Sequence, residues 1–138
     1  MKANKIILGT VQFGLNYGIN NKKGIPSKND IFKIFNYAFD NKIRILDSAE
    51  VYGNSHSLIG EFHTKNPDKI FDVITKIPKG FEGDINKKIY NYLFELKVNS
   101  LKSIFFHSFS DIKKNNAALN DLVCLKKLGL VESIGVSL

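Results

Sequence analysis

The chain is poor in cysteine and arginine and contains no long hydrophobic run. Cys124 is its single cysteine, which excludes an intramolecular disulfide. Because it lies in the apolar stretch Leu122-Val123-Cys124-Leu125, we expect a buried thiol on a helix. No apolar run approaches the length that spans a bilayer, and the N-terminal segment passes into Lys5-Ile6-Ile7-Leu8 without a signal-peptide pattern. We therefore expect a cytoplasmic protein with no membrane partner.

Arginine is equally scarce, since Arg44 is the only one, and the formal net charge of +7 comes almost wholly from lysine. The lysines are scattered along the chain in pairs such as Lys87-Lys88 and Lys126-Lys127. Nucleic-acid-binding proteins usually cluster Arg and Lys, whereas scattered pairs are typical of solvated helix faces. We expect no nucleic-acid partner, while an anionic small molecule stays open as a partner.

The length of 138 residues corresponds to one domain, and no linker or low-complexity stretch divides it, so we predict a single domain over residues 1–138. The apolar segment at residues 5–10 predicts a first strand. A connection of about 15 residues then follows, and connections of that length often form lids or binding loops. Its turn signals are Gly14, Gly18, Gly24 and Pro26.

Beyond this connection, helical and strand patterns alternate. Ser27 and Asp30 predict the start of a helix, and its apolar stripe is Ile31, Ile34, Phe35, Ala38 and Phe39. Further strands are predicted at 44–48, 71–76, 103–107 and 133–137, and further helices around 55–64, 85–97 and 117–128. Strands that read as apolar runs and are separated by helices favour a parallel α/β sheet.

Two architectures fit five such strands and four helices: a doubly wound open sheet and a (β/α) barrel of the TIM type. A doubly wound sheet usually carries a GxGxxG turn after its first strand, and Gly9-Thr10-Val11-Gln12-Phe13-Gly14 does not match it. This favours the barrel. Because a closed barrel needs roughly 250 residues, we predict an incomplete one made of its first five strands and first four helices.

Polar residues close four of the predicted strands: Asp47, Lys76, His107 and Ser137. They recur about every 30 residues, the length of one βα unit. Since parallel strands all point the same way, their carboxyl ends converge on one rim, where (β/α) barrels place their chemistry. Tyr52 follows Asp47 in the same connection. We interpret this set as a candidate proton-transfer site.

Each of these residues has an ordinary explanation when taken alone, such as a turn carboxylate, a rim aromatic or a structural histidine. Together they make chemical sense. A lysine at a barrel mouth needs a partner, which Asp47 supplies to Lys76. The positive charge of Lys76 then favours the phenolate of Tyr52, whose pKa is ordinarily about 10, and makes it a general acid. His107 orients a substrate carbonyl, and a hydride donor is the missing component.

Four segments resemble the aldo-keto reductase family in order and spacing. They are Asp47-Ser48-Ala49-Glu50-Val51-Tyr52-Gly53, Thr75-Lys76, Phe105-Phe106-His107 and Ile134-Gly135-Val136-Ser137. The resemblance covers nearly the whole chain, and the opening residues LGTVQFGLNYGI are similar to bacterial members.

The resemblance implies an NADP-dependent oxidoreductase that reduces an aldehyde or ketone, with NADH not excluded as cofactor. It implies that Tyr52 is the acid/base, that Asp47 and Lys76 tune it, and that His107 orients the carbonyl. It also implies cofactor contacts. Those contacts involve Asp47, Ser137 at the nicotinamide amide, and Gly9 and Thr10 at the nicotinamide pocket. No metal is implied, because one histidine with a lysine and a phenol is no zinc ligand set.

The resemblance also predicts a truncated chain, since a barrel has eight strands and this chain accounts for five. The loops that bind the cofactor phosphates in such barrels follow the seventh and eighth strands and would be missing. An incomplete barrel leaves two open sheet edges and an uncovered apolar face, which predicts self-association or a complementing chain. Two alternatives stay open: a non-catalytic, reductase-like binding or regulatory module, and a lyase that uses Lys76 as a Schiff-base nucleophile.

Overall fold

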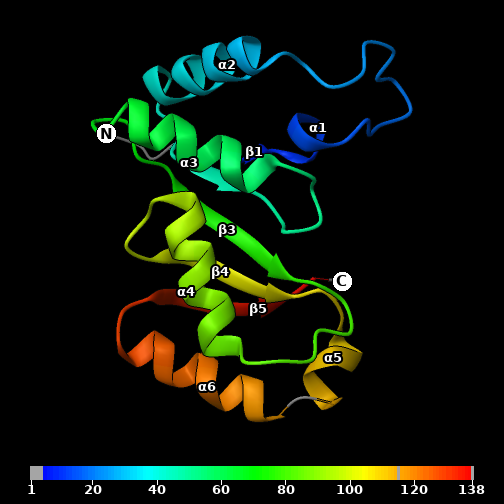
Figure 1. Ribbon diagram of the computed structural model, residues 1–138, viewed down its shortest axis with the longest axis vertical. Helices are drawn as coiled ribbons and strands as arrows, with labels where there is room; N and C mark the ends of the chain where they lie inside the picture. Colours follow the sequence, from blue (N-terminus) through cyan, green and yellow to red (C-terminus); the bar gives the residue numbers. More distant parts are fainter. Residues whose placement is uncertain (1–4, 115, 138) are drawn as a thin grey trace.

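One parallel sheet of five strands organises the part of the chain described by a computed structural model, residues 5–114 and 116–137 (Figure 1). The remaining residues of the predicted domain, 1–4, 115 and 138, lie outside the described residues. The strands are β1 (Leu8–Gly9), β2 (Ile45–Asp47), β3 (Asp72–Ile77), β4 (Leu101–Phe106) and β5 (Val131–Val136). They pair in sequence order, each parallel to the next, which confirms the predicted parallel α/β sheet.

Four longer helices cover one face of this sheet (Figure 1). They are α2 (Lys28–Asp40), α3 (Ser55–Lys65), α4 (Ile85–Leu96) and α6 (Asn116–Lys127). Neighbouring helices in this series contact each other, so they form a continuous layer. The opposite face, which would line the inside of a closed barrel, is left uncovered by this layer and carries partly exposed side chains such as Ile74 and Phe105. No helix in the described parts of the chain is long and apolar enough to cross a membrane.

An aromatic cluster forms the core between the helices and the first half of the sheet. Phe35 of α2, Phe62 of α3 and Phe71, which precedes β3, are all completely or almost completely buried. The ring centroids of Phe35 and Phe62 lie 5.1 Å apart, and those of Phe35 and Phe71 lie 5.7 Å apart. Burying one such ring contributes about 2 to 3 kcal/mol. The cluster therefore fixes how α2 and α3 dock on the strands that carry the site.

The helix predicted from Ser27 begins as expected, because the Ser27 hydroxyl accepts a hydrogen bond from the Asp30 amide at 3.2 Å. Of its predicted apolar stripe, Ile31, Phe35 and Ala38 are buried, while Ile34 is 38% exposed. The stripe is narrower than predicted because α2 lies at the end of the helical layer, where one neighbouring helix covers it (Figure 1).

Two short helices and the bounds of all five strands differ from the prediction; β4, for example, covers 101–106 instead of 103–107. Strand β1 has two residues instead of the predicted 5–10, and α1 (Val11–Gly14) occupies the start of the long connection. Helix α5 (Phe109–Lys114) was not predicted, and β5 covers 131–136 instead of 133–137. Helices of four to six residues carry too little periodicity to be detected in a sequence.

The predicted burial of Cys124 is wrong, since its thiol is exposed. Ala118, Leu122 and Leu125 are the core-facing residues of α6. Their spacing of four and three residues follows one face of the helix, and the helical rotation turns Cys124 to the outer side. The apolar stretch at 122–125 therefore marked two buried residues of the helix, Leu122 and Leu125, and not the burial of all four.

Candidate active site

A cavity of about 520 Å³ opens on the uncovered face of the sheet, at the carboxyl ends of the strands. Each strand or the residue that follows it contributes to the lining, so segments far apart in the sequence meet here. Its residues are Ile7, Gly9, Asp47, Ile74, Lys76, Phe105 and Ser137. The strand register explains this convergence, because Gly9 pairs with Asp47, and Lys76 pairs with Phe105. The predicted common rim therefore exists.

Lys76 and Asp47 form the predicted ion pair at this rim. The Lys76 ammonium Nζ donates to Asp47 Oδ1 at 2.5 Å and to the backbone carbonyl of Ser48 at 2.9 Å. The Lys76 side chain is 9% exposed, whereas that of Asp47 is 41% exposed. A buried amine is costly unless it is paired and hydrogen-bonded, and these two acceptors meet that requirement. The pair also ties β3 to the end of β2.

Tyr52 lies beside this pair. The Lys76 Nζ atom sits over the Tyr52 ring, 5.2 Å from the ring centroid. This distance is within the range of a cation–π contact. The positive charge of Lys76 is therefore next to the ring of Tyr52, as the sequence predicted. Lys76 contacts both Asp47 and Tyr52, so Asp47 acts on Tyr52 only by holding the lysine.

The connection that carries Tyr52 is packed tightly against α1. Gly53 has φ +58°, and a Cβ added there would lie 2.2 Å from the carbonyl oxygen of Gly14. A Cβ added to Gly14 would in turn lie 1.8 Å from the carbonyl oxygen of Tyr52. Only glycine at both positions allows the two backbones to approach this closely. This close approach fixes the backbone that directly follows Tyr52.

Gly9 and Thr10, the two predicted cofactor contacts of the first strand, differ in their surroundings. Gly9 lines the cavity. Thr10 is fully buried, and its hydroxyl donates to the Asp47 carbonyl at 3.1 Å and accepts from Ser55 at 2.7 Å. Thr10 thus holds the end of β1 against β2 and the start of α3. Its predicted cofactor contact stays a prediction.

Ser137 and His107 follow the last two strands. Ser137 lines the cavity, and its backbone amide donates to the Phe106 carbonyl at 2.9 Å. His107 comes directly after β4 and is exposed, and it is not one of the residues that line the cavity in the described structure. The structure therefore gathers Asp47, Lys76 and Ser137 in one cavity, whereas Tyr52 and His107 are not among the residues that line it. The predicted roles of all these residues stay predictions.

A partly buried polar cluster that was not predicted lies behind β3, on the helix side; the side chain of Glu50 is 40% exposed and that of Lys88 is 18% exposed. Tyr92 of α4 is 3% exposed, and its hydroxyl donates to Glu50 Oε2 at 2.5 Å. Lys88 Nζ donates to the same oxygen at 2.7 Å. The sequence hid this cluster because Tyr92 belongs to the apolar face of α4, together with Ile89 and Leu93. The one signal of this cluster in the sequence was Glu50, a charged residue within the segment that carries Tyr52.

His56, in the first turn of α3, is packed edge-on against the Tyr92 ring with centroids 5.2 Å apart. Its Nε2 atom lies 2.8 Å from the hydroxyl of Thr75, and its Nδ1 atom lies 3.7 Å from a carboxylate oxygen of Glu95. Burial lowers the pKa of His56 to about 4. The imidazole is therefore neutral at pH 7.

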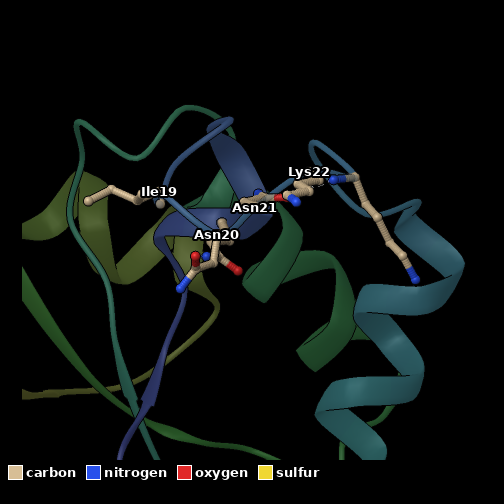
Figure 2. Close-up of a pocket in the computed structure, with 7 residues that line it drawn as sticks. Ile19, Asn20, Asn21 and Lys22 are labelled. Carbon is tan, nitrogen blue, oxygen red and sulfur yellow. Dashed lines mark hydrogen bonds between the residues drawn. The ribbon is translucent and has the colours of Figure 1, made fainter.

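A second cavity, of about 620 Å³, lies in the long connection between α1 and α2. Figure 2 shows Ile19, Asn20, Asn21 and Lys22 around it, all from that one connection. The connection extends away from the sheet (Figure 1), so this cavity is separate from the one at the strand ends. Within the described ranges, no group of three or more His, Cys, Asp or Glu side chains is placed to hold a metal ion.

Comparisons with known proteins identify a family for this fold. A model described as the aldo/keto reductase family matches residues 5–138. No curated protein matches the chain.

Solved structures share the fold. A protein of Pseudomonas aeruginosa described as an aldo-keto reductase has a TM-score of 0.77 and 24% identity, over 95% of this chain and 54% of its own. The glycerol dehydrogenase of Gluconobacter oxydans has a TM-score of 0.71 and 23% identity, over 94% of this chain and 43% of its own. An aldo-keto reductase of Klebsiella pneumoniae in complex with NADPH has a TM-score of 0.69 and 18% identity, over 96% of this chain and 45% of its own. The chain thus spans about half the length of these proteins.

Proposed function

The chain belongs to the aldo/keto reductase family, and on that premise we propose that it carries the acid–base machinery of an NADP-dependent oxidoreductase that reduces an aldehyde or ketone. The main support is the Lys76–Asp47 ion pair beside Tyr52 at the carboxyl ends of the strands. TIM-type barrels place their chemistry at this end of the sheet. The NADPH complex of the Klebsiella pneumoniae reductase supports the choice of cofactor.

Tyr52 is the proposed proton donor. As it gives its proton to the substrate oxygen, the Lys76 ammonium stabilises the phenolate that forms. Asp47 and the Ser48 carbonyl hold that ammonium in place. Two acceptors on Lys76 suit a charged donor rather than a free amine, which argues against the Schiff-base alternative.

The cavity at the strand ends suits a nicotinamide ring. Gly9 presents no side chain there, and a Cβ added to it would meet no atom within 4 Å, so the space beside it is open. Ile74 and Phe105 offer apolar walls, and the Ser137 hydroxyl offers a hydrogen-bond partner for the carboxamide. A bound reduced nicotinamide would supply the hydride. His107, which directly follows β4, would orient the substrate carbonyl.

Turnover by this proposed mechanism requires a closed barrel, which has more strands than the described residues contain. The uncovered face and the edge strands β1 and β5 would be closed by three further βα units, supplied by a continuation of the chain or by another chain. We propose that cofactor affinity depends on this closure, because barrels commonly bind phosphates with the loops after their seventh and eighth strands.

The test is a fluorescence titration with NADPH followed by assays of a generic aldehyde, for the wild type, Tyr52→Phe and Lys76→Met. Removing the proton donor lowers turnover by at least about a hundredfold, while NADPH binding by Tyr52→Phe is unchanged. Glu61→Gln, which removes a partly exposed carboxylate of α3 paired with Lys28 and Lys65, serves as a control with normal turnover. Binding without turnover in the wild type would favour the non-catalytic module, and unchanged turnover in Tyr52→Phe would refute the assignment.

A further inference from the structure

Glu50 stands two residues before Tyr52 and makes side-chain contacts that lead away from the cavity. One of its carboxylate oxygens accepts both from the Tyr92 hydroxyl at 2.5 Å and from Lys88 Nζ at 2.7 Å. Both partners belong to α4, about 40 residues further along the chain, so these contacts join the Tyr52 connection to a different βα unit. Hydrogen bonds that involve a charged group are about twice as strong as neutral ones.

The same tyrosine also reaches the strand that carries the lysine. The Tyr92 hydroxyl lies 3.4 Å from the backbone carbonyl oxygen of Lys76. One buried hydroxyl is therefore in contact with the segment before the proposed proton donor and with the backbone of its ammonium partner. The contacts among Glu50, Tyr92 and Lys76 thus link the two catalytic elements from behind the sheet.

The charge state of the cluster favours this arrangement. Burial alone would raise the pKa of Glu50, but the hydrogen bonds from Lys88 and Tyr92 outweigh it and hold that pKa below its usual value. Burial and the neighbouring carboxylate raise the pKa of Tyr92. Glu50 is thus an ionised acceptor and Tyr92 a protonated donor around neutral pH.

We propose that Glu50 is a positioning residue that fastens the Tyr52 connection to α4 and to the end of β3, and so sets the distance between Tyr52 and Lys76. The connection is then held on both sides of the phenol. Glu50 anchors it before Tyr52, and the contact of Gly53 with Gly14 anchors it after Tyr52. Ser48 and Ala49 are buried and stay fixed to β3 without this anchor, but residues 50–52 lose their side-chain hold and can move between Ala49 and the second anchor.

The catalytic part of this inference rests on the proposed function, but the positioning part does not require turnover. Amide hydrogen exchange across residues 48–54 and the ¹³Cζ resonance of Tyr52, assigned with Tyr52→Phe, report positioning directly. In Glu50→Ala, exchange in this segment rises about tenfold, and the Tyr52 resonance shifts or broadens. Glu50→Gln keeps an acceptor for Tyr92 and restores part of both signals.

Tyr92→Phe removes the donor hydroxyl while the ring keeps its packing, and it gives the same loosening if Glu50→Ala does not fold. Glu61→Gln is the matched control, because Glu61 is also a carboxylate that accepts from two side chains, Lys28 and Lys65, but lies outside the Tyr52 connection. In an active protein, Glu50→Ala lowers kcat about tenfold and leaves KM for NADPH unchanged.

Unchanged exchange and an unchanged Tyr52 resonance in both Glu50→Ala and Tyr92→Phe would overturn the inference, even if both variants were less stable. A wild type that binds NADPH without turnover, and whose Glu50→Ala variant still loosens residues 48–54, would refute the proposed function and leave the positioning role intact.

Discussion

Two connections leave the same rim of the sheet and are built in opposite ways. The second connection, residues 48–54 between β2 and α3, buries Ser48 and Ala49 and is held by close backbone packing at Gly53. The first connection, residues 15–27 between α1 and α2, exposes Tyr17 and Ile19 and depends on the side chain of one residue for most of its hydrogen bonds. That residue is Asn21.

The difference separates two tasks. The connection with Tyr52 is constrained where the proposed proton transfer needs a fixed phenol, since an error of about 1 Å in such a group is costly. The first connection lines the larger of the two cavities (Figure 2), and none of its residues is buried. Segments with those properties open at a low free-energy cost. We therefore expect the first connection to adapt to ligands and the second to stay fixed.

The largest effect is expected from Gly53→Ala, which breaks the fixed connection. The new Cβ combines a clash with the Gly14 carbonyl and an unfavourable positive φ, so the free energy of unfolding falls by about 4 kcal/mol. Gly24→Ala in the first connection is the matched control. Gly24 also has a positive φ, but its added Cβ meets no atom within 4 Å, and the cost is about 1 kcal/mol. Urea unfolding measures both, and equal costs would contradict the comparison.

Acid should weaken the second connection before the first, because protonation of buried His56 is unfavourable in the folded protein. His56 lies in the first turn of α3, which follows the second connection. Its pKa is about 4 in the folded protein and 6.5 ordinarily, so the unfolded chain binds more protons between these values. Stability is therefore complete above pH 6.5 and falls as the pH drops towards 4, by at most about 3 kcal/mol.

Urea unfolding of the wild type and His56→Gln at pH 7.5 and 5 tests this effect. His63 contributes in the same direction, because burial also lowers its pKa. The variant should consequently lose less stability than the wild type without becoming independent of pH. An identical loss in both proteins would show that His56 is not the source.

A smaller effect is expected from Asn21→Ala, which loosens the adaptable connection. The amide side chain donates to the carbonyls of Tyr17 and Gly24 and accepts from the amides of Lys23 and Gly24. The loop is largely exposed, so water replaces these bonds and the cost is about 1 kcal/mol. Hydrogen exchange should rise in residues 17–24 and stay constant in 48–54. A rise in both segments would mean that the two connections are coupled.

The smallest effect is expected at Cys124, outside both connections. Its exposed thiol should react with a disulfide reagent in the folded protein, without a measurable change in the unfolding midpoint. Reaction only after addition of urea would show that the thiol is buried.

The strand ends of the candidate site were predictable because each ends a buried apolar run. The Lys76–Asp47 pair was predictable because a lysine at a barrel mouth needs a nearby carboxylate. The Glu50–Tyr92 contact was not, since it joins residues 42 positions apart and Tyr92 follows the apolar pattern of its helix. The outward turn of Cys124 depended on the docking of α6, which a short apolar stretch does not reveal.

Deuterium transfer from NADPH in which both hydrogens at C4 of the nicotinamide are replaced by deuterium tests the central claim most directly. We predict that the wild type yields an alcohol with deuterium on the former carbonyl carbon, and that Tyr52→Phe binds the cofactor but forms almost no product. A wild-type product without deuterium, or full labelled turnover by Tyr52→Phe, would contradict the account.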